Sequence, residues 1–140
     1  MKHDNTPWLE ALTPEAEEAL GAERIQITHL PYRVGRESRV KVSRDGVTVM
    51  ERRKTGVRPS NDLYLHDRGR YLNVSRAHFQ IERDGEGFRL VDRGSALGTY
   101  VGGNRVGGND AGGVAALHAG EVIVVGSSES PFVFRFVTGA

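Results

Sequence analysis

The chain has 140 residues, which fits one domain that buries roughly two-thirds of its unfolded surface without a metal or disulfide. It contains no cysteine, which excludes disulfides, thiolate chemistry and cysteine-containing zinc sites. Its 19 basic and 18 acidic residues nearly balance, so the total charge gives no general attraction to nucleic acid. No segment has the apolar length of a signal peptide core or a membrane span, so we expect a cytoplasmic protein without membrane contact.

A short helix is predicted within an amino-terminal arm that spans residues 1–24. Thr13 suits the N-cap, Pro14 suits the first helical position, and Gly21 supplies the stop. A helix of this length is marginal on its own. We therefore expect four apolar residues of the arm to dock it on the rest of the chain: Trp8, Leu9, Leu12 and Leu20.

From Ile25 onward, short alternating apolar stretches are typical of strands. The pair Asp45-Gly46 predicts a tight hairpin turn, flanked by four valines that would share one face: Val40, Val42, Val47 and Val49. Six further strands are predicted between glycine-rich turns: Leu63–Leu65, Phe79–Glu82, Phe88–Val91, Thr99–Val101, Glu121–Val125 and Phe132–Val137. This pattern predicts an all-β fold, an antiparallel sandwich or a barrel.

Four segments, in this order, resemble the motifs of the forkhead-associated (FHA) domain family: Val34–Arg36, Asn61–Leu65, Val74–His78 and Asp92–Val101. The third matches the family's Ser-Arg-x-His signature, and the fourth resembles its Asp-x-Gly-Ser-x-Asn-Gly-Thr-x-Val turn. The order and spacing of the motifs are specific although each alone is weak. The resemblance implies an antiparallel β-sandwich of about eleven strands. The FHA domain would span residues 25–140 after the arm at 1–24, with an extra hairpin insertion at 37–60.

Domains of this family bind phosphothreonine peptides through loops at one end of the sandwich. The resemblance therefore implies a signalling interaction module and not an enzyme. Its partner would be a phosphothreonine-containing protein, such as the substrate of a Ser/Thr kinase. No cofactor is implied, and the histidines show no spacing typical of metal ligands.

The match to the motifs assigns phosphopeptide binding to five positions. Arg36 would be the main phosphate ligand, because a guanidinium offers two parallel donors and stays protonated. Ser75 would donate its hydroxyl and its backbone amide to a phosphate oxygen, and Arg76 would add charge at the rim. Leu97 and Gly98 would lie against the peptide.

The same match assigns structural support of the site to Gly35, His78 and Thr99. His78 would brace the binding loops through hydrogen bonds, since buried polar groups are normally satisfied within the fold. The alternative for His78 is a role in acid–base chemistry, which the resemblance disfavours. Ser75 lacks the Gly-x-Ser-x-Gly frame of a catalytic serine, and a simple turn residue is the alternative for it.

The sequence departs from the family pattern in the fourth motif and in the insertion. Leu97 replaces an asparagine that usually holds the peptide backbone, and Ala96 replaces a hydroxyl residue; neither side chain forms hydrogen bonds. We expect a weaker grip on the peptide, or an apolar contact between Leu97 and a particular partner. The insertion at 37–60 would widen the basic footprint, cover the site, or remain a solvated hairpin.

Three alternatives follow from the same residues. The first is a phosphate-independent assembly module with a degenerate binding site, suggested by Leu97, Ala96 and the added hairpin. The second is nucleic-acid binding through the basic stretch 33–58, which the balanced charge and the lack of interleaved aromatics disfavour. The third is a switch in which phosphorylated Thr6 or Thr13, each followed by proline, docks into the site of its own or a neighbouring chain.

Overall fold

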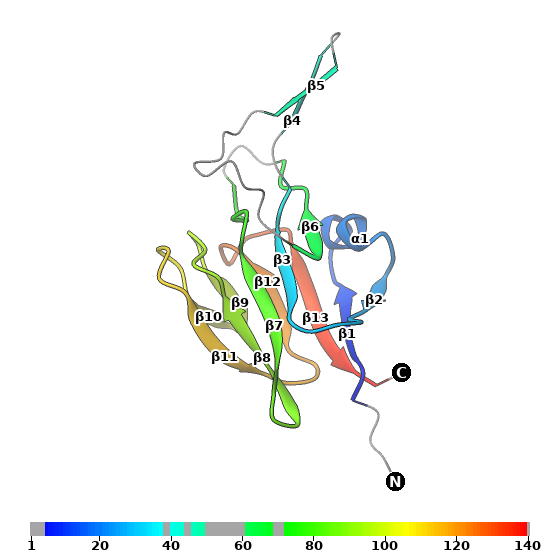
Figure 1. Cartoon of the computed structure of the whole chain (residues 1–140), viewed down its shortest axis with the longest axis vertical. Helices are drawn as coiled ribbons and strands as arrows, with labels where there is room; N and C mark the ends of the chain where they lie inside the picture. Colours follow the sequence, from blue (N-terminus) through cyan, green and yellow to red (C-terminus); the bar gives the residue numbers. More distant parts are fainter. Residues whose placement is uncertain (1–4, 38–39, 44–45, 50–60, 69–71, 140) are drawn as a thin grey trace.

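The computed structural model describes residues 5–37, 40–43, 46–49, 61–68 and 72–139 (Figure 1). The described elements, in chain order, are β1 (Pro7–Ala11), α1 (Pro14–Leu20), β2 (Arg24–Gln26), β3 (Tyr32–Arg36), β4 (Val40–Ser43), β5 (Gly46–Val49), β6 (Leu63–Leu65), β7 (Phe79–Asp84), β8 (Gly87–Asp92), β9 (Thr99–Val101), β10 (Asn104–Val106), β11 (Gly113–Leu117), β12 (Val122–Val125) and β13 (Val133–Thr138).

Two sheets form the sandwich. One has six strands in the order β10-β9-β12-β13-β1-β2, and the other has five in the order β11-β8-β7-β3-β6. These eleven strands and the one short helix confirm the predicted sandwich. The pair β3 and β6 runs parallel, whereas the other strand pairs of the two sheets are antiparallel. Parallel neighbours need a connection of about a dozen residues or more, and the chain between Arg36 and Leu63 supplies that length.

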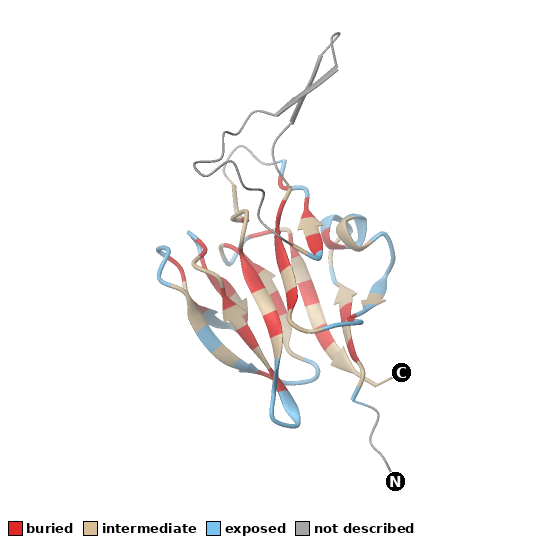
Figure 2. Cartoon of the chain, viewed as in Figure 1, coloured by how far each residue is buried: buried red, intermediate tan, exposed pale blue. Residues whose placement is uncertain are grey.

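The core lies between the two sheets, where buried residues alternate with partly exposed ones along the strands (Figure 2). In β7, Phe79 and Ile81 are buried while Gln80 points away, as the period of two in a strand requires. The rings of Phe88 in β8 and Phe136 in β13 lie 5.2 Å apart, so they join the two sheets. Each buried Phe contributes about 1.5–3 kcal/mol to stability.

The predicted helix is confirmed with the limits expected for it. The hydroxyl of Thr13 caps it by accepting a hydrogen bond from the Ala16 amide (3.2 Å), and Gly21 ends it with φ +72°. The same hydroxyl donates to the Pro131 carbonyl (2.5 Å), which fastens the helix to the loop before β13. These two contacts support the capping role of Thr13.

No helix among the described residues is long and apolar enough to cross a membrane.

The arm begins with a strand, β1, that was not predicted from the sequence. β1 pairs with β13 on one side and with β2 on the other, so the arm contributes to the six-stranded sheet. Leu9 is fully buried, and Trp8 packs under the guanidinium of Arg24 at 4.6 Å. Leu20 is partly buried against the core. Leu12, which was also expected to dock the helix, is 37% exposed.

The valine hairpin is present as a separate two-stranded sheet, β4-β5. Its register pairs Val40 with Val49 and Val42 with Val47, and it closes at Ser43 opposite Gly46. Gly46 is therefore a residue of β5, whereas the Asp45-Gly46 signal had predicted it to be part of the turn. The side chains of the hairpin and residues 50–60 lie outside the description, so the role of the insertion stays a prediction.

Candidate functional site

Ser75 joins three segments at the end of the sandwich where β3 and β8 finish. Its carbonyl accepts a hydrogen bond from the Arg36 amide at 2.9 Å, and its hydroxyl accepts one from the Ala96 amide at 3.0 Å. The end of β3, the loop before β7 and the turn between β8 and β9 are thus tied together. Because the hydroxyl oxygen accepts from Ala96, its own proton can be donated to another acceptor.

The Arg36 guanidinium is held in place beside Ser75. Arg36 is only 8% exposed, and its Nε donates to the Val74 carbonyl at 2.8 Å. This bond fixes the plane of the guanidinium. The predicted phosphate ligands Arg36 and Ser75 therefore lie at the same end of the fold, joined by a direct backbone hydrogen bond.

Gly35 allows β3 to pass unusually close to the loop that carries Arg76. A Cβ atom at position 35 would lie 2.0 Å from the Arg76 carbonyl oxygen and 2.7 Å from Nδ2 of Asn61. Asn61 Nδ2 donates to that same carbonyl at 2.8 Å. Any larger residue at position 35 would push the loop away from β3. Arg76 itself is partly buried next to the site.

His78 connects the loop before β7 to the turn before β9. It is fully buried, its Nδ1 accepts from the Ser75 amide (3.0 Å), and its Nε2 lies 2.7 Å from the Gly98 carbonyl. A carbonyl can only accept, so the proton sits on Nε2 and the ring is neutral. Burial lowers the pKa of His78. The Ser75 amide is thus bonded to His78, whereas the sequence reading expected it to bind phosphate.

We expect the free energy of unfolding to fall as the pH drops through the range in which His78 would become charged. In the unfolded chain, the His78 imidazole gains a proton near the ordinary histidine pKa of about 6.5. In the folded chain, the buried ring stays neutral to lower pH. The contribution of His78 to the free energy of unfolding is therefore fully present above that pKa. Below it, the free energy of unfolding declines by up to about 1.4 kcal/mol per pH unit. Urea unfolding at about pH 7.5 and about pH 5 measures this decline. In His78→Gln the dependence should be shallower, and an unchanged slope would contradict the assignment.

A buried carboxylate organises the turn that follows β8. Asp92 is 3% exposed, and its Oδ1 accepts from the amides of Gly94 (3.0 Å) and Ser95 (2.8 Å). Its Oδ2 accepts from the hydroxyls of Ser95 (2.6 Å) and Thr99 (3.0 Å), and the Ser95 hydroxyl accepts from the Gly98 amide (2.9 Å). The sequence reading singled out Thr99 but not Asp92 or Ser95. Asp92 and Ser95 both lie within the fourth motif, which is the sequence signal that could have identified them.

Leu97 and Ala96 form the exposed tip of this turn. Leu97 is 37% exposed, and Gly98 follows it with φ +86°, a backbone conformation that favours glycine. A second loop, residues 107–112, packs along the tip: the Asn109 amide donates to the Ala96 carbonyl at 2.8 Å. Arg105 Nε donates to the Leu97 carbonyl at 3.2 Å. Neither this loop nor Arg105 was identified from the sequence.

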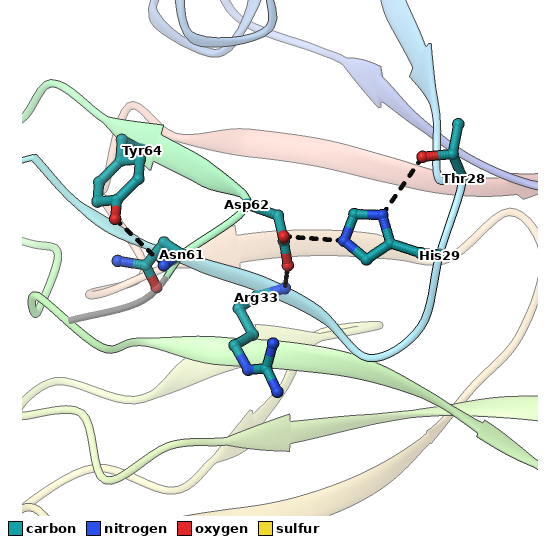
Figure 3. A network of polar contacts seen from close by, with 6 residues as sticks. All are labelled: Thr28, His29, Arg33, Asn61, Asp62 and Tyr64. Carbon is teal, nitrogen blue, oxygen red and sulfur yellow. Dashed lines mark hydrogen bonds and ion pairs between the residues drawn. The ribbon is translucent and has the colours of Figure 1, made fainter.

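A second polar network braces the segment beside Gly35 (Figure 3). Asp62 accepts from the Arg33 amide and contacts His29 Nε2, both at 2.8 Å. Partial burial acts to raise the pKa of Asp62, but these hydrogen bonds outweigh it and hold the pKa below its usual value. The Asn61 amide donates to the Tyr64 hydroxyl at 3.2 Å. The network fixes Asn61, whose side chain supports the Arg76 carbonyl.

Comparison with known proteins identifies the family. A model of the FHA domain matches residues 32–126. The chain belongs to the FHA domain family. The family match spans all four motifs, including Gly35, Arg36, Ser75, His78 and the turn before β9.

Three similar proteins show how far the likeness extends. The chain is 41% identical over 46 residues to the oxoglutarate dehydrogenase inhibitor of Corynebacterium jeikeium (strain K411), which covers 33% of this chain and 29% of that protein. EmbR of Mycobacterium tuberculosis, solved with a low-affinity phosphopeptide, has a TM-score of 0.59 and 19% identity over 97% of this chain and 25% of EmbR. A structure from work on phosphothreonine-dependent FHA domain interactions has a TM-score of 0.56 and 20% identity, covering 96% of this chain and 98% of that chain. The chain thus spans less than a third of the length of the first two proteins.

Proposed function

We propose that this FHA domain binds a phosphothreonine-containing segment of a partner protein and thereby recruits that partner without catalysing a reaction. The observation that carries the proposal is the pairing of Arg36 and Ser75 at one end of the sandwich, through a backbone hydrogen bond of 2.9 Å. A phosphothreonine brings a charge of about −1.5 to −2 at neutral pH and three strong acceptor oxygens. A guanidinium and a hydroxyl proton are the donors that such a group needs.

The rigidity of this pair supports the proposal. The guanidinium plane of Arg36 is fixed by the Val74 carbonyl, and the Ser75 hydroxyl is oriented by the amide of Ala96. The Ser75 backbone is anchored through His78. Donors that are already ordered lose less entropy when a ligand binds. The phosphopeptide bound to EmbR and the phosphothreonine-dependent interactions of the other relative point in the same direction.

In this proposal, Ala96 and Leu97 at the tip of the turn between β8 and β9 determine how strongly the phosphothreonine peptide binds. The side chains of Leu97 and Ala96 form no hydrogen bonds with a peptide. The Ala96 amide and both carbonyls are already bonded within the domain, to Ser75, Asn109 and Arg105. Each missing side-chain hydrogen bond reduces affinity by an amount on the order of 1–3 kcal/mol, or roughly ten- to hundredfold. The exposed Leu97 side chain instead offers an apolar contact. We therefore expect a modest affinity for generic phosphothreonine peptides and a preference for apolar residues near the phosphate.

The test is binding to a degenerate phosphothreonine peptide library, measured beside the same library without phosphate. We expect binding that depends on the phosphate. The sequences of the selected peptides then show which class of Ser/Thr kinase substrate the domain prefers. A phosphoserine version of the best peptide shows whether the threonine methyl group is recognised. Equal affinity for phosphorylated and unphosphorylated peptides would overturn the proposal.

A second candidate function is phosphate-independent assembly, and the exposed Leu97 at the tip of the turn favours it. In that case the domain would associate with a partner or with itself through apolar contacts. Light scattering of the wild type and of Arg36→Ala distinguishes the two functions. An assembly that survives the substitution unchanged would favour this candidate, whereas a monomer that binds only phosphorylated peptide would exclude it.

A further inference from the structure

Arg105 in β10 holds its guanidinium against the tip of the turn between β8 and β9. Its Nε donates to the Leu97 carbonyl at 3.2 Å. Two glycines leave the space that the group occupies: a Cβ atom at Gly98 would lie 3.0 Å from Nε, and one at Gly108 would lie 2.3 Å from Nη2. The guanidinium therefore lies close to the backbone on both sides, at Gly98 and at Gly108.

The charged end of Arg105 has no ion pair among the described residues, and the residue is exposed. The loop 107–112 contains one acidic residue, Asp110, whose backbone amide donates to the Ser95 carbonyl at 3.0 Å. Of the five N–H donors in a guanidinium, the Leu97 carbonyl uses only the one on Nε. An ordered, exposed guanidinium of this kind suits a carboxylate, which it contacts with two parallel hydrogen bonds.

The place of Arg105 relative to the phosphate ligands follows from two consecutive residues of the turn. The Ala96 amide donates to the Ser75 hydroxyl, and the next residue, Leu97, accepts from Arg105. Consecutive Cα atoms are about 3.8 Å apart, so the Ser75 hydroxyl and the guanidinium contact neighbouring points of one surface. An extended peptide advances about 3.3 Å per residue. A side chain within about three residues of a phosphate on Arg36 and Ser75 therefore reaches Arg105.

We propose that Arg105 is a specificity residue that binds a carboxylate of the partner close to the phosphothreonine, so that the preferred ligand is an acidic phosphothreonine segment. This inference rests on the proposed phosphopeptide function. It extends the recognition surface from the phosphate ligands, across Leu97, to a second fixed cation. The apolar tip and the guanidinium beside it together select which phosphorylated segments bind.

The experiment pairs peptide variants with domain variants. The best phosphothreonine peptide is prepared with Glu or Gln at each position within about four residues of the phosphate, and affinities are measured by fluorescence polarisation. In the wild type we expect Glu to be favoured over Gln by about two- to fivefold at one or two positions, the upper part of the range measured for exposed ion pairs. In Arg105→Gln, which keeps a donor for the Leu97 carbonyl, this preference should disappear while binding of the Gln peptide stays within about twofold.

Two further variants complete the design. Arg105→Lys keeps the charge but not the forked donors, so it should retain part of the preference. Arg83→Gln removes an exposed arginine near the hairpin between β7 and β8, at the other end of the sandwich, and should leave the preference unchanged. Thermal melts confirm that each variant is folded.

An unchanged Glu-to-Gln ratio in Arg105→Gln would overturn the inference and leave the phosphopeptide function intact. If Arg105→Gln does not fold, loss of all preference in a folded Arg105→Lys would also count against the inference. If the wild type does not distinguish phosphorylated from unphosphorylated peptide, the proposed function and this inference both fail.

Discussion

Replacement of Arg36 by alanine should lower the affinity for a phosphothreonine peptide by at least about a hundredfold. Each charge-assisted hydrogen bond to a phosphate oxygen is worth about 1.5–3 kcal/mol, and the guanidinium is built to form two of them. The substitution also removes the bond from Nε to the Val74 carbonyl, which helps to hold the loop that carries Ser75. Fluorescence polarisation with phosphorylated and unphosphorylated peptides measures the loss.

Two matched variants separate the loss of charge from the loss of geometry. Arg36→Lys keeps a positive charge but cannot form the forked contact or the bond to Val74, so we expect about a tenfold loss. Arg33→Ala removes another arginine of β3, whose side chain is partly exposed, and should bind like the wild type. Because Arg36 is buried, circular dichroism must first show that each variant is folded. Affinity within about threefold of the wild type in a folded Arg36→Ala would contradict the phosphate-ligand role.

The fold was predictable where apolar residues alternate strongly. Strands near Phe79–Glu82 and Phe88–Val91 were found at the expected places because their buried face carries large apolar side chains. β11 was missed because alanines occupy both its exposed and its partly buried positions, so the alternation has little contrast. β1 was missed for another reason. Its partner β13 lies at the far end of the chain, and local pattern carries no information about that pairing.

The site was predictable to the extent that it resides in contiguous motifs. The structure brings Arg36, Ser75 and His78, which come from two of the four motifs, together at one end of the sandwich. The hydrogen bond from the Ala96 amide to the Ser75 hydroxyl, and the one from Arg105 to the Leu97 carbonyl, join segments that no single motif contains. Such contacts depend on how the loops meet in three dimensions. No spacing rule in the sequence encodes them.

Asp92→Ala should give the largest loss of stability among the site variants, about 3–5 kcal/mol in the free energy of unfolding. The carboxylate accepts four hydrogen bonds, from two amides and two hydroxyls, and the residue is only 3% exposed. Without it, these donors stay buried, and each unsatisfied group costs about 1–3 kcal/mol unless the turn rearranges. A rearranged turn would no longer present the Ala96 amide to the Ser75 hydroxyl at 3.0 Å. Phosphopeptide affinity should therefore fall together with stability.

Urea unfolding of a graded series tests this account. Thr99→Val removes one of the four donors in a side chain of nearly the same shape, and should cost about 1 kcal/mol. Asp92→Asn keeps acceptor capacity on one oxygen but turns an amide toward buried donors, so it should fall between Thr99→Val and Asp92→Ala. Asp84→Ala removes an exposed carboxylate at the opposite hairpin and should change stability by less than about 0.5 kcal/mol. If Asp92→Ala costs no more than Thr99→Val, Asp92 does not organise the turn, and the geometry of the binding loops must have another source.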